Sequence, residues 1–139
     1  MDKITITGRP ANGSTAVGEA LVCPRSIMGW NGVDLKTGEI TEKGHLHEGV
    51  SVKGKVLVIP GSSGSVAWSD SFYACHLNDC GPVAYVLTQM DSKVGTTVLV
   101  SDIPCVTDFP DGTDPCTIIE TGDQVIVDGD KGTVEIVKK

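Results

Sequence analysis

The stretch KVLVIPGSSGSVAWSDSFYACHLNDCGPVAYVL, residues 55–87, decides the fold of this chain. It opens with an apolar run at residues 55–59, which is typical of a strand buried on both faces. A turn rich in glycine and serine follows at residues 60–65, and a second apolar run stands at residues 83–87. With a helix between the two runs, the order predicts two parallel strands joined by a right-handed crossover.

Residues 66–79 supply that helix. Trp68, Phe72 and Cys75 lie four and three positions apart, so a helix would place them on one apolar face. Ser65 is a natural N-cap residue, and a glycine–proline pair after residue 80 predicts that the helix has ended there.

The rest of the chain is dominated by β-branched residues and turn glycines, which favour short strands joined by tight turns. Residues 8–18 are expected to form a loop, and the last two strands are expected to form a hairpin. Further strands are predicted at residues 3–7, 19–22, 97–100, 105–106, 124–127 and 133–137. The prediction is a single mixed α/β domain over residues 1–139, rich in strands, with a mixed sheet and one main helix.

Composition excludes several classes of function. The chain has 139 residues and a net charge of −7, so it lacks the basic surface with which proteins bind nucleic acids. The sequence contains no apolar run long enough for a membrane span and does not start like a signal peptide, so we expect a cytoplasmic protein. Its five cysteines form no CxxC pair, and we expect free, buried thiols.

The glycine–serine turn is the strongest candidate for a site. It follows a buried strand and precedes a helix, where α/β proteins place ligands and where free N–H groups attract anions. The turn lacks the lysine of a nucleotide-binding P-loop and the spacing of a hydrolase nucleophile elbow. A tight turn with a capping serine and no ligand is the alternative reading.

The other candidates are weaker. His45 and His47 have HxH spacing, and a metal site there would need a third ligand, for example Glu42 or Glu48. We expect instead a solvated pair in a loop. Trp30 and Trp68 are expected to lie either in the core or in the wall of a pocket, with the core as the first choice, which is less secure for Trp30 because it stands in a glycine-rich loop.

Several motifs together resemble the small subunit of the aconitase X family. They occur in the family's order and span residues 8–137. The motifs are GEALV at 18–22, GWNGVD at 29–34 with TG at 37–38, GKVLVIP at 54–60, GS at 64–65 and SDIP at 101–104.

The resemblance implies a swivelling domain with β/β/α layers that pairs with a large catalytic subunit. Family members are hydro-lyases, that is, dehydratases of small hydroxylated acids such as cis-3-hydroxy-L-proline or (R)-5-phosphomevalonate. Iron, as an ion or a cluster, is expected on the large subunit, and no cofactor is expected on this chain.

The resemblance also implies roles for individual residues. A serine at a helix start acts as the base in such domains, which makes Ser65 the catalytic candidate. The backbone N–H groups at the helix start, that of Val66 included, would stabilise its alkoxide. The residues expected to bind substrate are Ser62, Ser63, Gly64, Val66, Asn31 and Gly32.

Two departures from the family pattern bear on the substrate. Asn31 replaces the first of two adjacent glycines, and Ser63 stands where archaeal members usually carry a lysine. Without that cation, a phosphorylated substrate is disfavoured, and we expect cis-3-hydroxy-L-proline over (R)-5-phosphomevalonate.

Two alternatives remain. The segment TGDQVIVDG at 121–129 is similar to phosphohistidine carrier domains, but the matching turn at residues 64–67 has no histidine. A non-catalytic binding module, in which the serine only caps a helix, is the second alternative.

Overall fold

A computed structural model describes residues 3–139 and shows eight strands and three helices in that range. The strands are β1 (Lys3–Thr7), β2 (Arg9–Asn12), β3 (Thr15–Val22), β4 (Val56–Ile59), β5 (Ala84–Leu87), β6 (Cys105–Thr107), β7 (Gln124–Asp128) and β8 (Thr133–Val137). The helices are α1 (Val66–Leu77), α2 (Ser92–Ser101) and α3 (Pro115–Ile118).

The strands form one mixed sheet in the order β1-β8-β7-β3-β4-β5-β6-β2. Strand β3 joins its two halves, because Thr15 to Glu19 pair antiparallel with β7 while Ala20 to Val22 pair parallel with β4. Strands β3, β4, β5 and β6 are all parallel to their neighbours in this set. The central strands β4 and β5 are buried at every position, as their continuous apolar sequences predict.

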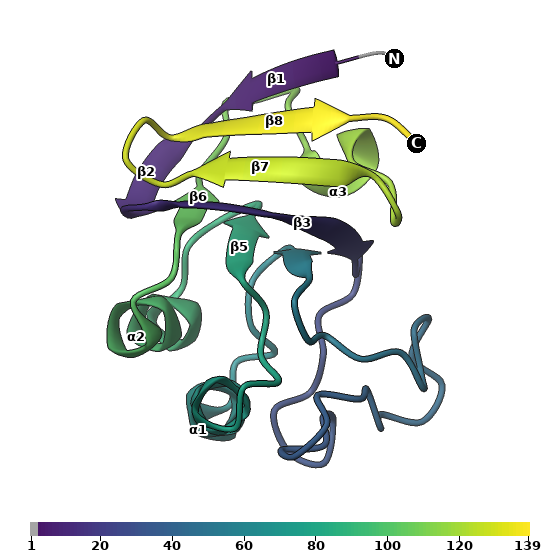
Figure 1. Ribbon diagram of the computed structural model, residues 1–139. Helices are drawn as coiled ribbons and strands as arrows, with labels where there is room; N and C mark the ends of the chain where they lie inside the picture. The colour runs from purple at the N-terminus through teal and green to yellow at the C-terminus, as the bar shows by residue number, and fades with distance from the viewer. Residues whose placement is uncertain (1–2) are drawn as a thin grey trace.

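The fold has three layers (Figure 1): the antiparallel strands β1, β8 and β7 lie over the parallel strands, and α1 and α2 cover the other face. Two buried clusters fill the two interfaces between layers. One lies between the halves of the sheet and includes Val58 and Val127. The other lies under the helices and includes Trp68, Phe72 and Tyr85. The β/β/α arrangement expected from the resemblance is therefore confirmed.

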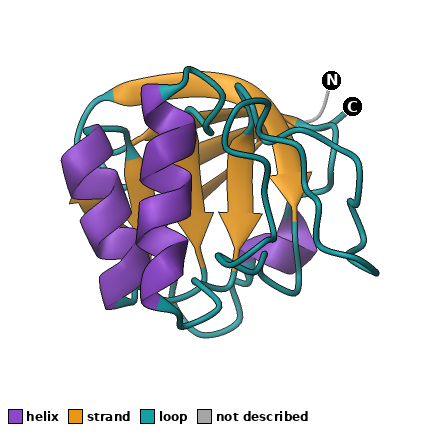
Figure 2. Ribbon diagram, turned by 90° about the horizontal axis from the view of Figure 1, so that it is seen from below, coloured by secondary structure: helices purple, strands orange, loops and turns teal. Residues whose placement is uncertain are grey.

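Helices α1 and α2 lie side by side, with their axes roughly along the direction of the strands that they cover (Figure 2). In α1 the rings of Trp68 and Phe72 stack with centroids 4.2 Å apart, and both side chains are fully buried. The helical spacing read from the sequence thus identified the buried face correctly. The helix ends at Leu77, two residues before the predicted end, and Asp79 then adopts a left-handed conformation with φ of 58°.

Two local predictions are wrong, and one short helix was missed. The strand expected at residues 97–100 lies inside α2, because Asp91 caps a helix there and Val94 and Val98 face the core. The loop expected at residues 8–18 contains the edge strand β2 at residues 9–12, and β3 begins at Thr15, four residues before the predicted strand at 19–22. The short helix α3 was not predicted. Strands β4, β5 and β6 and the β7–β8 hairpin are confirmed. Within residues 3–139, none of the helices combines the length and the apolar character needed to traverse a bilayer.

The buried carboxylate of Asp123 binds the C-terminal residues Lys138 and Lys139. Asp123 is fully buried, and its Oδ2 accepts hydrogen bonds from Lys138 Nζ at 2.6 Å and from the N–H of Glu120 at 2.8 Å. Burial alone would raise the pKa of Asp123, but these donors and the N–H of Lys139 lower it. The carboxylate is therefore ionised and is held by the Lys138 ammonium group and by the N–H groups of Glu120 and Lys139.

We expect Asp123→Asn to lower the free energy of unfolding by about 2 kcal/mol at neutral pH, because it removes a buried, paired charge. The folded pKa is depressed, so this stabilisation is present above about pH 4 and is lost as the pH falls through the folded pKa. Urea unfolding at several pH values measures the difference. Asp70→Asn, at an exposed position of α1, is the control. A gap between wild type and Asp123→Asn that stayed constant on acidification would contradict this account.

Candidate functional site

Four loops meet at one edge of the sheet, because β3, β4, β5 and β6 are parallel and their carboxyl ends point the same way. The glycine–serine turn follows β4, and Asp91 follows β5. Ligands of open α/β sheets bind at this edge. The fold therefore places the predicted turn where a binding site is expected.

Ser65 is the N-cap of α1. Its backbone is extended, with φ of −87° and ψ of 144°, and its Oγ accepts a hydrogen bond from the N–H of Ala67 at 3.2 Å. Gly64 has φ of 92°, which a residue with a side chain rarely adopts. Ser63, Gly64 and Ser65 are exposed, so the Ser65 hydroxyl is accessible from outside. Val66 begins α1, but its side chain lies outside the described part of the chain.

Asp91 holds the start of this turn. Its Oδ2 accepts a hydrogen bond from the N–H of Ser62 at 2.6 Å, while its Oδ1 caps α2 through the N–H groups of Lys93 and Val94. Burial tends to raise the pKa of Asp91, but these N–H donors lower it overall. An ionised carboxylate therefore ties the loop after β4 to the loop after β5. A Cβ at Gly61 would lie 2.7 Å from Asp91 Oδ2, so glycine permits this close approach.

The sequence reading missed Asp91. The signal available was an aspartate directly before Ser92 and Lys93 at the start of an apolar helical pattern, which is typical of an N-cap. Ser62 was expected to bind substrate, but its polar groups are engaged within the turn. Its N–H donates to Asp91, and its Oγ accepts the N–H of Gly64 at 3.1 Å. Both polar groups of Ser62 thus support the turn. Ser63 has its exposed hydroxyl available for a ligand.

The loop around Asn31 and Gly32 lies beside the same helix start. A Cβ at Gly29 would meet the backbone N and Cα of Trp68 at 2.4 Å, and the hydroxyl of Ser71 donates to the Gly29 carbonyl at 2.7 Å. The loop 28–32 therefore packs directly on the first turns of α1. Asn31 is exposed and has φ of 57°, whereas Gly32 is buried. The structure thus brings both predicted segments of the site to one region.

Two weaker predictions fail. Trp30 is 69% exposed, so its first-choice placement in the core is wrong, whereas the alternative placement in a pocket wall agrees with the pocket that it lines. His45 is buried rather than solvated, and its Nδ1 accepts the N–H of His47 at 3.0 Å. Burial is the main cause that lowers the pKa of His45, which keeps the ring neutral at neutral pH. His47 in turn holds the carbonyl of Val22 at 2.7 Å through Nε2.

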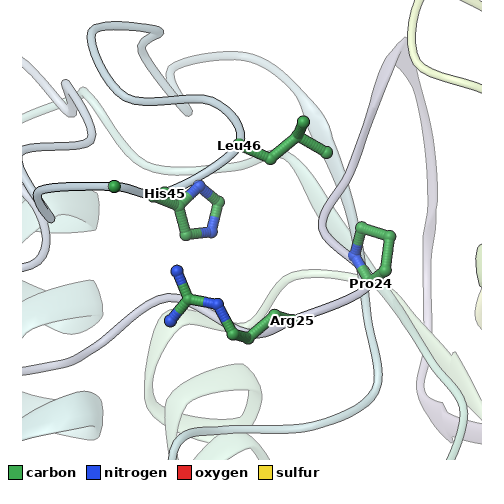
Figure 3. A pocket seen from close by; sticks show the side chains of 5 residues that line it. Pro24, Arg25, His45 and Leu46 are labelled. Carbon is green, nitrogen blue, oxygen red and sulfur yellow. The ribbon is translucent and has the colours of Figure 1, made fainter.

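His45 also lines a pocket of about 340 Å³ (Figure 3), where its ring faces the side chain of Arg25. Arg25 is not free there, because its guanidinium pairs with Glu42 at 2.6 Å. Glu42 in turn accepts the N–H of Met28 at 2.8 Å. These contacts hold the beginning of the β3–β4 connection to its middle, so Arg25 and Glu42 have structural partners. Nε2 of His45 is buried and has no hydrogen-bond partner among the described residues.

The donor groups that the structure describes do not fit a metal site. Among residues 3–139, no three His, Cys, Asp or Glu side chains lie close enough together to hold an ion. All five cysteines are free, and four of them are buried. Burial raises the pKa of Cys23, Cys75 and Cys105 to about 12, so these thiols stay protonated and are poor ligands.

The geometry therefore offers one accessible hydroxyl at a helix N-terminus, with a backbone N–H directed at its oxygen. A donor of this kind stabilises negative charge on the oxygen, and the positive end of the helix dipole adds to it. The turn therefore presents to the outside a hydroxyl whose oxygen is polarised by the start of α1.

Fold and turn together define a swivelling α/β domain with a serine at a helix start. The family model described as "Aconitase X swivel domain" matches residues 5–136. The chain belongs to this family.

Several relatives match over nearly their whole length. The phosphomevalonate dehydratase small subunit of Methanocella arvoryzae is 37% identical, covering 94% of this chain and 98% of the relative. That of Methanosarcina mazei is 33% identical, covering 100% and 95%. A chain of Thermococcus kodakaraensis aconitase X in its holo form superposes with a TM-score of 0.87 at 36% identity, covering 97% of this chain and 99% of that one.

We expect Asp91→Ala to loosen the turn. The variant loses the N-cap of α2, which costs about 1 kcal/mol, and also the partner of the Ser62 N–H. Amide hydrogen exchange should therefore accelerate at Ser62 by about tenfold or more. The control is Asp114→Ala, which removes the corresponding cap of α3 and should leave exchange at Ser62 unchanged. Equal exchange at Ser62 in both variants would show that Asp91 does not hold the turn.

Proposed function

We propose that this chain is the small subunit of an aconitase X-type dehydratase and that it supplies Ser65 as the base to an active site completed by a larger partner. The observation that carries the proposal is the exposed Ser65 hydroxyl, which receives the N–H of Ala67 at the start of α1. The partner is inferred from relatives that are named small subunits and that this chain matches over at least 94% of its length.

The metal-ligating side chains of this chain support the same assignment of roles to the two subunits. The described residues bring no cluster of metal ligands together, whereas the family resemblance implies iron, as an ion or a cluster. We therefore place the iron, together with most of the substrate contacts, on the large subunit. This chain alone should not catalyse the reaction.

Dehydration removes a proton from one carbon and a hydroxide from its neighbour, leaving a double bond and a water molecule. In our proposal the Ser65 alkoxide takes the proton from the carbon, and the C–H electron pair forms the double bond as the C–O bond breaks. The departing hydroxide is protonated by a group of the large subunit. Ser65 can act in this way only when its alkoxide is stabilised, which is the role of the helix start.

Charge at the turn favours a substrate without a phosphate. Asp91 is ionised beneath the turn, and the guanidinium of Arg25 is already paired with Glu42. A serine, Ser63, stands where archaeal members usually carry a lysine. A phosphate dianion would meet a nearby carboxylate without a compensating cation from this turn. We therefore propose cis-3-hydroxy-L-proline, whose ring nitrogen is positively charged, as the substrate.

The second candidate is (R)-5-phosphomevalonate. The observation in its favour is that the relatives named above from Methanocella and Methanosarcina are phosphomevalonate dehydratase small subunits. Under this alternative, the large subunit would have to supply all the cations that bind the phosphate.

Replacement of Ser65 tests the proposed base. In a complex with the large subunit, Ser65→Ala and Ser65→Gly should both lower kcat by about 10²–10⁴-fold, because both remove the hydroxyl. Alanine also removes the helix cap, at a cost of about 1 kcal/mol, whereas glycine costs only a few tenths. Equal loss of turnover despite unequal loss of stability would identify chemistry rather than capping. Near wild-type turnover in either variant would exclude Ser65 as the base.

Substrate choice is tested with the same complex. We expect dehydration of cis-3-hydroxy-L-proline, followed as water loss by NMR, and much lower kcat/KM with (R)-5-phosphomevalonate. The matched variant is Ser63→Lys, which restores a cation at the turn and should raise kcat/KM for the phosphorylated acid only. Faster turnover of (R)-5-phosphomevalonate by the wild-type complex would establish the second candidate instead.

A further inference from the structure

The loop 28–32 displays two large apolar side chains beside the serine turn. Trp30 is 69% exposed and Met28 is 46% exposed, whereas the other tryptophan, Trp68, is fully buried. Exposed tryptophans of this kind are uncommon on an isolated surface and are enriched at the centres of protein interfaces. Covering Trp30 would remove a large apolar area from water.

The loop holds these side chains in place. Gly29 packs against the backbone of Trp68, and its carbonyl accepts the Ser71 hydroxyl. On the other side, Thr41 donates from its hydroxyl to the Asn31 carbonyl at 3.0 Å and from its N–H to the Gly32 carbonyl at 2.9 Å. A loop fixed at both sides loses little conformational freedom on binding, which favours affinity.

The surface next to Trp30 is hollowed. A pocket of about 450 Å³ is lined by Met28, Trp30, Asn31, Thr41, Glu42 and Lys43. It offers space for a side chain of a partner to insert beside the indole. An apolar projection next to a hollow is the arrangement expected of an interface core rather than of a solvated loop.

We propose that Trp30 and Met28 form the docking anchor for the large subunit of the dehydratase complex. This inference rests on the proposed function. Its physical basis is that the surface around Trp30 adjoins the surface at Ser65. A partner that presents a substrate to the Ser65 oxygen must reach the first turn of α1. Gly29 packs on that same turn, and Trp30 is the next residue along the chain. A surface that completes the site at Ser65 therefore also covers the exposed indole.

Binding of the purified large subunit, measured by isothermal titration calorimetry, tests the proposal. We expect Trp30→Ser to raise Kd by about 30-fold or more, since a tryptophan at the centre of an interface contributes strongly to affinity. The control is Leu99→Ser on α2, where the leucine is similarly exposed at 67% but lies on a different element. Its Kd should stay within about twofold of wild type. Thermal unfolding of both isolated variants checks that they are folded.

A second measurement reports on the tryptophan directly. The chain has two tryptophans, so labelling with 5-fluorotryptophan gives two ¹⁹F signals, and Trp30→Phe assigns them. Addition of the large subunit should shift and broaden the Trp30 signal and produce a smaller change at buried Trp68. Unchanged Kd in Trp30→Ser together with an unchanged Trp30 signal would overturn the docking surface.

The two proposals can fail separately. If Ser65→Gly abolishes turnover while Trp30→Ser binds as tightly as wild type, the docking surface is wrong and the proposed base stands. If Trp30→Ser weakens binding but Ser65→Gly remains active, the docking surface stands and the base is wrong. Failure of the wild-type chain to bind the large subunit at all would overturn both.

Discussion

Parallel pairing of four adjacent strands is the constraint on which the rest of this molecule depends. Because β3, β4, β5 and β6 run in the same direction, the segments that follow them gather at one edge of the sheet. Strand β3 also belongs to the antiparallel half, so the layer of β1, β8 and β7 is built onto the same framework. The serine turn, the Asp91 carboxylate and the loop that carries Trp30 all start from this edge, although they are far apart in the sequence.

The chemistry open to the serine turn depends on two charges near it: the positive end of the α1 dipole and the carboxylate of Asp91. The N–H of Ala67 is directed at the Ser65 oxygen, and the helix dipole adds positive potential at the same place. Asp91 uses its negative charge on backbone N–H groups of two loops, which fixes the turn but makes the surroundings unfavourable for a second anion. In the proposed reaction, this turn stabilises the Ser65 alkoxide, and the remaining groups come from the large subunit.

Sequence patterns predicted the elements in which local and global preferences agree. The apolar runs of β4 and β5, the spacing of Trp68 and Phe72 and the capping Ser65 all identified their structures correctly. Patterns failed where tertiary context decides. The valines and threonines of residues 94–100 favour a strand locally, but the Asp91 cap and packing on α1 make them helical. A single sequence also does not show which faces are covered. His45 was therefore expected in solvent but is buried, and Trp30 was expected first in the core but is exposed beside a pocket. The link between Asp91 and Ser62 spans 29 residues and could be seen only in three dimensions.

The central claim is that this chain contributes the Ser65 oxygen to a reaction centre shared with a larger subunit. The most direct measurement is a crystal structure of the complex with cis-3-hydroxy-L-proline, or with a non-reacting analogue, bound. The account predicts the Ser65 oxygen about 3–3.5 Å from the carbon that loses its proton, with the N–H of Ala67 still directed at that oxygen. A bound substrate contacted only by the large subunit, with Ser65 on a surface remote from it, would contradict the account.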